Sequence, residues 1–397
     1  MSDLRGADLL TGDFYGYGSL LTDDEQKVIG RVREFCRTEI APIALDAWSR
    51  AEFPHEIVPK FADLDIAALP YEGLGGPAAR RLLIGFVSLE LAHTDPSLNS
   101  FFGIHNGLAM GSIDLCGSAE QRERWLPAMA RMEQIGAFGL TEPHGGSDVA
   151  QGLETTARRE GDTWVLEGEK RWIGNATFAD LVVIWARDEA DGAVKGFVVH
   201  KDNPGMTATK IENKIALRTV QNADIVLTDC RVPEEDRLQR ANSFKDTNGV
   251  LRRTRGGVAW GATGTMMAAY ETALAYSTER EQFGRPIAGF QLVQDLLVRM
   301  LGNITASLGM CVRLAEMQDA GEARDEHAAL AKEYTTTAMR ETVALARQVV
   351  GGNGVVLDYG VAKFFADAEA LYSFEGTREI NTLVVGRAIT GHSAFVH

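Results

Sequence analysis

The sequence contains little cysteine, and no arrangement of it suggests a disulfide or a metal site. Its 397 residues include four cysteines, which lie far apart and form no CxxC pair. Isolated cysteines behave as small apolar residues, so we predict buried free thiols. The eight histidines show no HExxH or similar ligand spacing, and we therefore predict no protein-bound metal. The cysteines are Cys36, Cys116, Cys230 and Cys311.

Positive charge and long apolar runs are also scarce. The chain has 40 Lys and Arg against 55 Asp and Glu, a formal net charge of −15. Nucleic-acid binding needs a basic face, so we expect no such partner, although a local basic patch could still hold a phosphorylated cofactor. The longest apolar stretches, such as residues 181–186, have the length of strands and do not suggest a membrane span. No secretory signal is visible, and we expect a cytoplasmic protein.

The apolar residues that are present change their period twice along the chain. From about residue 21 to 132 the spacing is helical, and Thr22 followed by Glu25 predicts a capped helix start. After about residue 249 a helical period returns and continues to the end. The apolar stripes that we expect to be buried in these two regions are Val28, Val32, Phe35 and Ile40; Val293, Leu297, Met300, Ile304, Leu308, Cys311 and Leu314; and Leu330, Tyr334, Ala338, Leu345 and Val349.

The segment between residues 138 and 230 consists of short β-branched runs separated by Gly, Asp, Asn and Pro. This pattern predicts a small antiparallel barrel or sandwich, with a hairpin turn at Glu167 and Gly168. The fold class is therefore mainly α with a central β domain. We predict an N-terminal helical domain at residues 1–135, a small antiparallel β-barrel at 136–245 and a C-terminal four-helix bundle at 246–397.

Four segments of the last two-thirds of the chain combine glycine with polar and aromatic residues. They are residues 138–148 (FGLTEPHGGSD), 171–175 (RWIGN), 280–284 (REQFG) with Gln291, and 348–354 (QVVGGNG) with 374–379 (FEGTRE). In this order they resemble the signature segments of the acyl-CoA dehydrogenase superfamily, whose helix–β–helix fold the chain also matches. Within that superfamily the chain is most similar to the glutaryl-CoA dehydrogenases and the short-chain acyl-CoA oxidases, whose typical ending matches residues 386–391.

The resemblance implies an FAD enzyme that converts a short- or medium-chain acyl-CoA to the trans-2-enoyl-CoA, in fatty acid or amino acid catabolism. Removing an α-proton and a β-hydride needs a carboxylate on one side of the substrate and an oxidised flavin on the other. By resemblance Glu375 is the general base, and burial beside an apolar acyl chain would raise its pKa. Its backbone N–H, together with a flavin hydroxyl, would stabilise the enolate charge. Some relatives carry the base near the position of Thr254, which has no carboxylate.

The resemblance also assigns residues to FAD. Thr141 and Ser147 are small hydroxyls around a Gly-rich turn, suited to the isoalloxazine edge, and Trp172 would lie against the ring. One group resembles residues that reach the pyrophosphate and adenosine across a subunit contact, namely Arg280, Phe283 and Gln291. A complementary group comprises Gln348, Gly351, Gly352, Thr377 and Glu379. The remaining implied FAD residues are Phe138, Leu140, Gly146, Ile173 and Gly174. A site shared in this way implies a homotetramer.

Substrate-binding residues follow from the same likeness. They are Asn99, Ser147, Arg255, Phe374 and Gly376. Two readings of Arg255 stay open: a cation close to the catalytic carboxylate, or a member of a CoA-phosphate cluster with Arg252 and Arg253.

The sequence departs from the family pattern at three positions. Asn99 stands where glutaryl-CoA enzymes have an Arg for the distal carboxylate, and the amide cannot form a bidentate cationic fork. Gly174 stands where most dehydrogenases have Thr or Ser, and several oxidases have Gly, which leaves room for O2. The electron acceptor is thus an electron-transfer flavoprotein or O2. Phe374 replaces a common Tyr and loses only its hydroxyl. The alternative functions are a glutaryl-CoA dehydrogenase, a short-chain acyl-CoA oxidase and a non-catalytic protein of the same fold.

Overall fold

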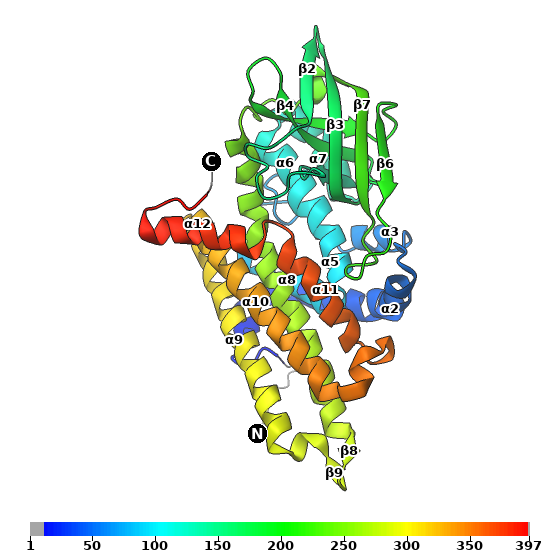
Figure 1. The fold of residues 1–397 in the computed structure, drawn as a ribbon, viewed down its shortest axis with the longest axis vertical. Coiled ribbons are helices and arrows are strands. Elements are labelled where there is room, and N and C mark those ends of the chain that lie inside the picture. Colours follow the sequence, from blue (N-terminus) through cyan, green and yellow to red (C-terminus); the bar gives the residue numbers. More distant parts are fainter. Residues whose placement is uncertain (1–11, 396–397) are drawn as a thin grey trace.

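The computed structural model describes residues 12–395, in which one helical part precedes a β-sheet along the chain and another follows it (Figure 1). The first part contains seven α-helices, and η3 (Ile104–Ala109) is a π-helical turn between α5 and α6. The helices are α1 (Asp23–Phe35), α2 (Ala41–Arg50), α3 (Ile57–Ala62), α4 (Arg81–Thr94), α5 (Pro96–Gly103), α6 (Met110–Cys116) and α7 (Ala119–Ala130).

The predicted start of α1 is confirmed. The Glu25 N–H donates to Thr22 Oγ1 at 3.3 Å, and the Thr22 N–H donates to Glu25 Oε2 at 2.8 Å, which satisfies two N–H groups that a helix start leaves without partners. Val32 and Phe35 are buried as expected, and Ile29 joins them. The four cysteines are free and buried, as predicted, and burial raises the pKa of each thiol to about 12.

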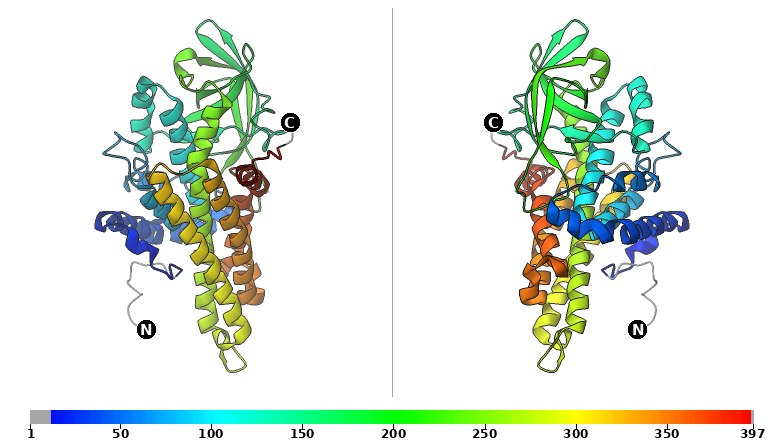
Figure 2. Two further views of the ribbon diagram at one scale, coloured as in Figure 1. Left: turned by 90° about the vertical axis from the view of Figure 1, so that its left-hand side faces the viewer. Right: turned by 90° about the vertical axis from the view of Figure 1, so that its right-hand side faces the viewer.

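The central part is one curled sheet of seven strands. They are β1 (Gly136–Gly139), β2 (Thr156–Glu160), β3 (Thr163–Gly174), β4 (Leu181–Asp188), β5 (Val194–His200), β6 (Met206–Lys210) and β7 (Asn222–Pro233). The strand order is β1-β4-β2-β3-β7-β6, with β5 on β4. The central β domain is confirmed, but its pairing is mixed, because β4 runs parallel to both β1 and β2. Figure 2 shows the sheet at one end of the molecule, with the bundle extending away from it.

The predicted hairpin turn at Glu167 and Gly168 is wrong. Strand β3 runs through both residues, and its register on β7 shifts between Leu166 and Gly168. Gly168 has φ 143°, and a Cβ there would lie 2.8 Å from the Thr155 Cα, so glycine marks a bulge and a close backbone approach. The turn lies instead at Gly161, between the paired strands β2 and β3.

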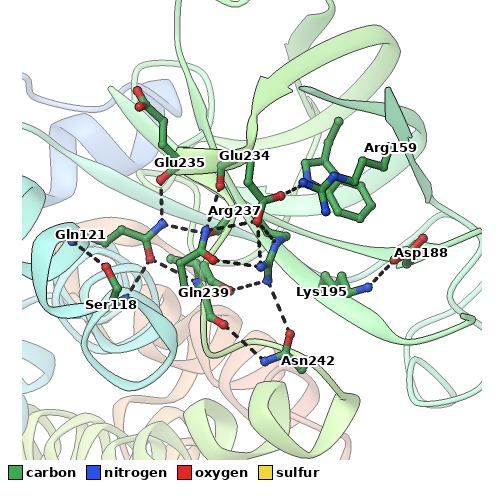
Figure 3. A network of polar contacts seen from close by, with 12 residues as sticks. Ser118, Gln121, Arg159, Asp188, Lys195, Glu234, Glu235, Arg237, Gln239 and Asn242 are labelled. Atoms are coloured by element: carbon green, nitrogen blue, oxygen red, sulfur yellow. Dashed lines mark hydrogen bonds and ion pairs between the residues drawn. The ribbon is translucent and has the colours of Figure 1, made fainter. Parts of the chain in front are cut away.

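A polar network joins the sheet to α7 (Figure 3). Gln121 Nε2 donates to the carbonyls of Glu235 and Arg237, at 2.7 Å each. Its Oε1 accepts the N–H of Ser118 at 2.9 Å, and Gln239 Nε2 donates to the Glu234 carbonyl at 2.9 Å. The amide of Gln121 thus connects α7 to the segment around residues 234–239, which follows the last strand of the sheet.

The last part is the bundle of α8 (Phe244–Glu279), α9 (Gln291–Asp319), α10 (Asp325–Val350) and α11 (Val361–Ser373), with α12 (Arg378–Thr390) across its upper end (Figure 1). The hairpin of β8 (Glu281–Gln282) and β9 (Arg285–Pro286) forms the opposite tip. Leu297, Met300 and Ile304 of the predicted α9 stripe are buried. Among the described residues, α9 is long and apolar enough to cross a membrane, but it packs against α8 and α10, and core helices reach the same composition.

The predicted stripe on α10 is wrong at its beginning. Leu330 and Tyr334 are exposed, whereas Ala338, Leu345 and Val349 are buried as expected. In the first turns of α10 the buried face consists of small and polar residues. The apolar periodicity therefore predicts the wrong face of the helix as the buried one there. These small and polar residues are Ala328, Ala331, Lys332, Thr335 and Thr336.

Candidate active site

A cavity of about 1600 Å³ lies where the three parts of the fold meet. Its walls come from α4, α5, η3, the segments after β1 and around residues 213–222, the end of β3, the start of α8 and the α11–α12 junction. Small-molecule pockets commonly measure ~300–1,000 Å³, so this cavity has room for two extended ligands. The predicted site residues that line it are Asn99, Phe138, Leu140, Thr141, Gly146, Ser147, Trp172, Ile173, Gly174, Arg255, Phe374, Glu375, Gly376 and Thr377.

Glu375 lies in the break between α11 and α12 and has a left-handed backbone, with φ 57°. This conformation typically costs a residue other than glycine about 1–3 kcal/mol and is concentrated at functional sites. Gly376 follows with φ 79°, which glycine adopts without strain. Thr377 then caps α12, because its Oγ1 accepts the Ile380 N–H at 3.3 Å. The sharp turn directs the Glu375 side chain into the cavity.

Two cations and one hydroxyl face the Glu375 carboxylate. Thr254 Oγ1 donates to Glu375 Oε2 at 3.4 Å, and Arg255 on α8 and Lys332 on α10 lie close enough to stabilise the ionised form. Burial nevertheless dominates and raises the pKa of Glu375 above its ordinary value. Arg255 is only 6% exposed, and its Nε has no hydrogen-bond partner among residues 12–395.

The structure favours the interpretation of Arg255 as a cation close to the Glu375 carboxylate over its membership of a CoA-phosphate cluster. Arg252 pairs with Asp325 on α10 at 3.1 Å, and Arg253 pairs with Asp114 on α6 at 2.7 Å. Arg253 also lines the cavity, but Arg252 and Arg253 are each bound to an aspartate, and Arg255 is the one of the three whose charge acts on Glu375.

Another part of the cavity wall comes from the end of β3 and the segment after β1. Trp172 is 51% exposed, with φ 66°, and is therefore a ring presented at the surface of the cavity and not a core residue. Leu140, Ile173 and Gly174 are buried beside it, and Thr141 is half-buried. An apolar wall with a hydroxyl and an exposed aromatic ring fits a flat heteroaromatic group such as a flavin.

Gly174 lines the cavity, and the tip of the Ile104 side chain lies directly beside it. A Cβ at this position would lie 2.3 Å from Ile104 Cδ1, so the Ile104 side chain on η3 occupies the room that a Thr or Ser would need. The sequence suggested space for O2 at Gly174, and the structure fills that space with a neighbouring side chain.

An ion pair that the sequence did not suggest supports the wall around Thr141. Lys170 is fully buried and donates to Glu142 Oε1 at 2.7 Å and to the Leu140 carbonyl at 3.2 Å. Burial lowers the pKa of Lys170 to about 8, and Glu142 is the group that opposes this shift. The Glu142 carboxylate also accepts the N–H groups of Glu154 and Thr155, at 2.6 and 2.9 Å.

We expect Glu142→Ala to lower the free energy of unfolding by about 3–5 kcal/mol, because it leaves Lys170 buried without its counter-charge. Denaturant unfolding followed by circular dichroism measures this. Glu169→Ala is the control, since Glu169 is an exposed acid on β3, next to Lys170. Equal stability of the two variants would contradict a role for the ion pair.

The end of the cavity between α4, α5 and α8 is mostly apolar. Phe102, Val258 and Trp260 contribute to it, and Ser88, Asn99 and Ser100 add neutral polar groups. Ser88 Oγ donates to Asn99 Oδ1 at 3.1 Å, so these two neutral groups partner each other. A Cβ at Gly85 would lie 2.1 Å from the Trp260 ring, which shows that the indole seals the space between α4 and α8.

Six other predicted cofactor residues lie far from Glu375, at the lower tip of the bundle. Arg280, Phe283 and Gln291 are exposed, on or next to the β8–β9 hairpin (Figure 1). The second group of residues predicted to bind FAD, from Gln348 to Glu379, lies at two separate places in the chain's fold. Gln348, Gly351 and Gly352 end α10 at the same tip, where Asn353 Nδ2 donates to the Tyr276 hydroxyl at 3.1 Å. Thr377 and Glu379 remain at the Glu375 end.

Sequence reasoning missed Lys332, Ile104, Trp260 and the Glu142–Lys170 pair. The sequence carries no signal for Lys332, because only the structure shows that it lies on the buried face of α10. Glu142 lies within the recognised segment 138–148, but its partner Lys170 carries no signal of its own. Among the described residues, no group of His, Cys, Asp and Glu could hold a metal ion.

Comparisons with known proteins identify the class to which this fold and cavity belong. Three models of acyl-CoA dehydrogenase domains match the chain: the N-terminal domain at residues 22–133, the middle domain at 137–230 and the C-terminal domain at 244–390. The chain is 31% identical over 370 residues to the mitochondrial short-chain specific acyl-CoA dehydrogenase of Mus musculus. The alignment covers 92% of this chain and 90% of that relative.

Solved structures agree with the domain matches. A glutaryl-CoA dehydrogenase from Mycobacterium smegmatis superposes with a TM-score of 0.93 at 37% identity, over 96% of this chain and 98% of that one. Another glutaryl-CoA dehydrogenase structure from that organism, in complex with FADH2, has a TM-score of 0.93 at 33% identity and the same coverage. The chain belongs to the acyl-CoA dehydrogenase family. It is an oxidoreductase of that family, and its cofactor is FAD.

Proposed function

We propose that the protein oxidises a neutral short- or medium-chain acyl-CoA to the trans-2-enoyl-CoA, with Glu375 as the general base. The observation that carries the proposal is the Glu375 carboxylate, which enters the shared cavity from a left-handed turn and has a raised pKa. A base with a pKa raised toward the working pH holds the transferred proton more firmly than an ordinary carboxylate does.

Each group around Glu375 has a role in this reaction. A Glu375 carboxylate oxygen removes the α-proton, and the neighbouring cations Arg255 and Lys332 keep enough of the carboxylate ionised beforehand. The backbone N–H of Glu375 has no hydrogen-bond partner among residues 12–395, so it is available to the thioester carbonyl as enolate charge develops. When bound, FAD accepts the hydride that leaves the β-carbon.

FAD would lie along the wall of the sheet. Thr141 and Ser147 offer hydroxyls to its edge, Trp172 offers a ring face, and Thr377 begins α12, whose N–H groups favour phosphate. The substrate thioester would lie between this wall and Glu375, with Phe374 and Gly376 beside it. The acyl chain would point toward Asn99.

We propose an electron-transfer flavoprotein as acceptor in preference to O2, because Ile104 fills the space beside Gly174. The experiment that tests the proposed function is anaerobic mixing of the purified flavoprotein with a panel of acyl-CoAs, followed by admission of air. We expect rapid loss of the oxidised flavin spectrum with butyryl-CoA and slow recovery in air. No bleaching with any acyl-CoA would contradict the proposed reaction, and rapid recovery would identify an oxidase.

The lower tip of the bundle suggests a shared cofactor site. Its apolar side chains Phe283, Leu292 and Val355 are 94%, 83% and 69% exposed, which is unusual unless another surface covers them. We expect a tetramer of paired dimers in which Arg280 and Gln348 of one subunit reach the FAD of another. Analytical ultracentrifugation checks this, and a stable monomer that carries a full complement of FAD would contradict it.

A further inference from the structure

Lys332 is a fully buried lysine, and no carboxylate of residues 12–395 lies in hydrogen-bond contact with it. It projects from α10 toward the turn that carries Glu375, and its Nζ donates to two backbone carbonyls, those of Phe374 and Gly376. These residues directly precede and follow Glu375. These contacts help to stabilise a charged amine that is removed from water, as do the charges of Glu375 and Glu379, but burial dominates and lowers the pKa of Lys332 to about 8.

The two acceptors explain how one side chain acts on the turn. Phe374 O belongs to the peptide group that precedes the left-handed Glu375, and Gly376 O belongs to the Gly376–Thr377 peptide group, so a single ammonium that binds both holds the two ends of the Glu375–Gly376 turn. Asn381 provides a second tether, because its Nδ2 donates to Gly376 O at 2.9 Å. Arg378 pairs with Glu333, the neighbour of Lys332, at 2.9 Å.

We infer that Lys332 is a positioning residue for the general base: it holds the strained turn that aims Glu375 into the cavity and supplies part of the positive charge that the carboxylate faces. The inference rests on the proposed role of Glu375. Lys332 itself lies outside the residues that line the cavity, so its action passes through the turn.

The charged and titratable groups around Glu375 make the electrostatic part testable. Arg255 on α8 and Lys332 on α10 both favour the ionised carboxylate, and Thr254 on α8 donates a hydrogen bond to it. Glu379 on α12 is the acid that acts on Lys332 besides Glu375. Glu375 works as a base only when ionised, so activity rises with pH through its pKa. Loss of the Lys332 charge raises that pKa and moves the acidic limb to higher pH.

The test compares Lys332→Met with Lys332→Gln in the FAD-loaded enzyme. The two replacements have equal length and no charge, but only the amide can donate to the two carbonyls. We expect Met to lower kcat on the order of 10- to 100-fold, as a misplaced catalytic group does, and Gln to lower it less. In both variants the acidic limb of the kcat/KM profile should move to higher pH.

Thr336→Val is the matched control on the same helix. Thr336 is buried one turn along α10, and its Oγ1 donates to the Lys332 carbonyl at 2.7 Å, so this variant loses a buried hydrogen bond without altering the Glu375 turn. It should lower the melting temperature and leave the pH profile unchanged. A purely structural role for Lys332 predicts that the Met and Gln variants behave like this control.

The outcomes separate this inference from the proposed function. A kcat within twofold of wild type and an unmoved acidic limb in the Lys332 variants, beside an inactive Glu375→Gln enzyme, would overturn the inference alone. If Lys332→Met does not fold, the same result for Lys332→Gln overturns it. An active Glu375→Gln enzyme would overturn the proposed base and this inference together.

Discussion

Replacement of Glu375 by Gln is expected to lower kcat by about 10²–10⁴-fold, the usual effect of losing a positioned general base. The amide has nearly the shape of the carboxylate, so the turn, the cavity and FAD binding should remain. It cannot accept the α-proton, and Thr254, the hydrogen-bond donor to Glu375, has no basic group to replace it. Steady-state turnover of butyryl-CoA, normalised to flavin content, measures the loss.

The stability of the same variant provides an independent check. Because the folded protein raises the pKa of Glu375, the free energy of unfolding falls as the pH rises from the ordinary carboxyl pKa to the folded pKa, and the full cost is present above the folded pKa. Gln removes that cost, so the Gln variant should melt at or above the wild-type temperature near pH 7, and its advantage should shrink as the pH falls. Glu341→Gln, an exposed acid on α10 bound to Arg299, is the control for amide substitution in general. A fully active and less stable Glu375→Gln enzyme would contradict this account.

Butyryl-CoA is expected to exceed glutaryl-CoA in kcat/KM by roughly 30- to 1000-fold, which corresponds to ~2–4 kcal/mol for a missing charged pair. The end of the cavity at Asn99 offers a neutral amide already bound to Ser88, with Phe102 and Trp260 around it. An unpaired carboxylate placed among such groups loses hydration without an ionic partner. Parallel kinetics with the two thioesters measure the preference.

The structure also identifies a cation besides Arg255 that could reverse this preference. Arg81, at the start of α4, lines the same cavity, and its guanidinium has no ion pair among the described residues, whereas Arg253 beside it is bound to Asp114. Efficient oxidation of glutaryl-CoA, with decarboxylation to crotonyl-CoA, would contradict the prediction. In that case Arg81→Met should abolish the glutaryl activity, and Asn99→Arg should change it little.

The sequence predicted the parts of the site that local motifs encode. Thr141, Trp172 and Glu375 come from three separate segments, each with its own glycine-containing turn, and the fold brings all three to one cavity. The helix start at Thr22 was equally local and is confirmed. Motifs of this kind carry their backbone geometry with them, so their role is visible before the tertiary structure is known.

The features that sequence could not predict depend on tertiary neighbours. Lys332 lies outside the apolar stripe that the sequence predicts for α10 and would ordinarily lie at the surface, and only the packed Glu375 turn explains its burial. Gly174 alone suggested free space, but the space belongs to Ile104, 70 residues earlier in the chain. The sequence predicts a turn at Gly168, where the structure has a bulge within β3, because glycine is typical of both bulges and turns.

Single-turnover reduction of the flavin tests the central claim most directly. Wild-type enzyme and Glu375→Gln, matched for bound FAD, are mixed anaerobically with butyryl-CoA in a stopped-flow instrument while the oxidised flavin absorbance is recorded. Product release and the electron acceptor play no part in this step, so the rate reports the chemistry at the α- and β-carbons. We predict rapid bleaching of the wild-type flavin and bleaching slower by at least about 10²-fold in the variant. Equal rates for the two proteins would show that Glu375 is not the base.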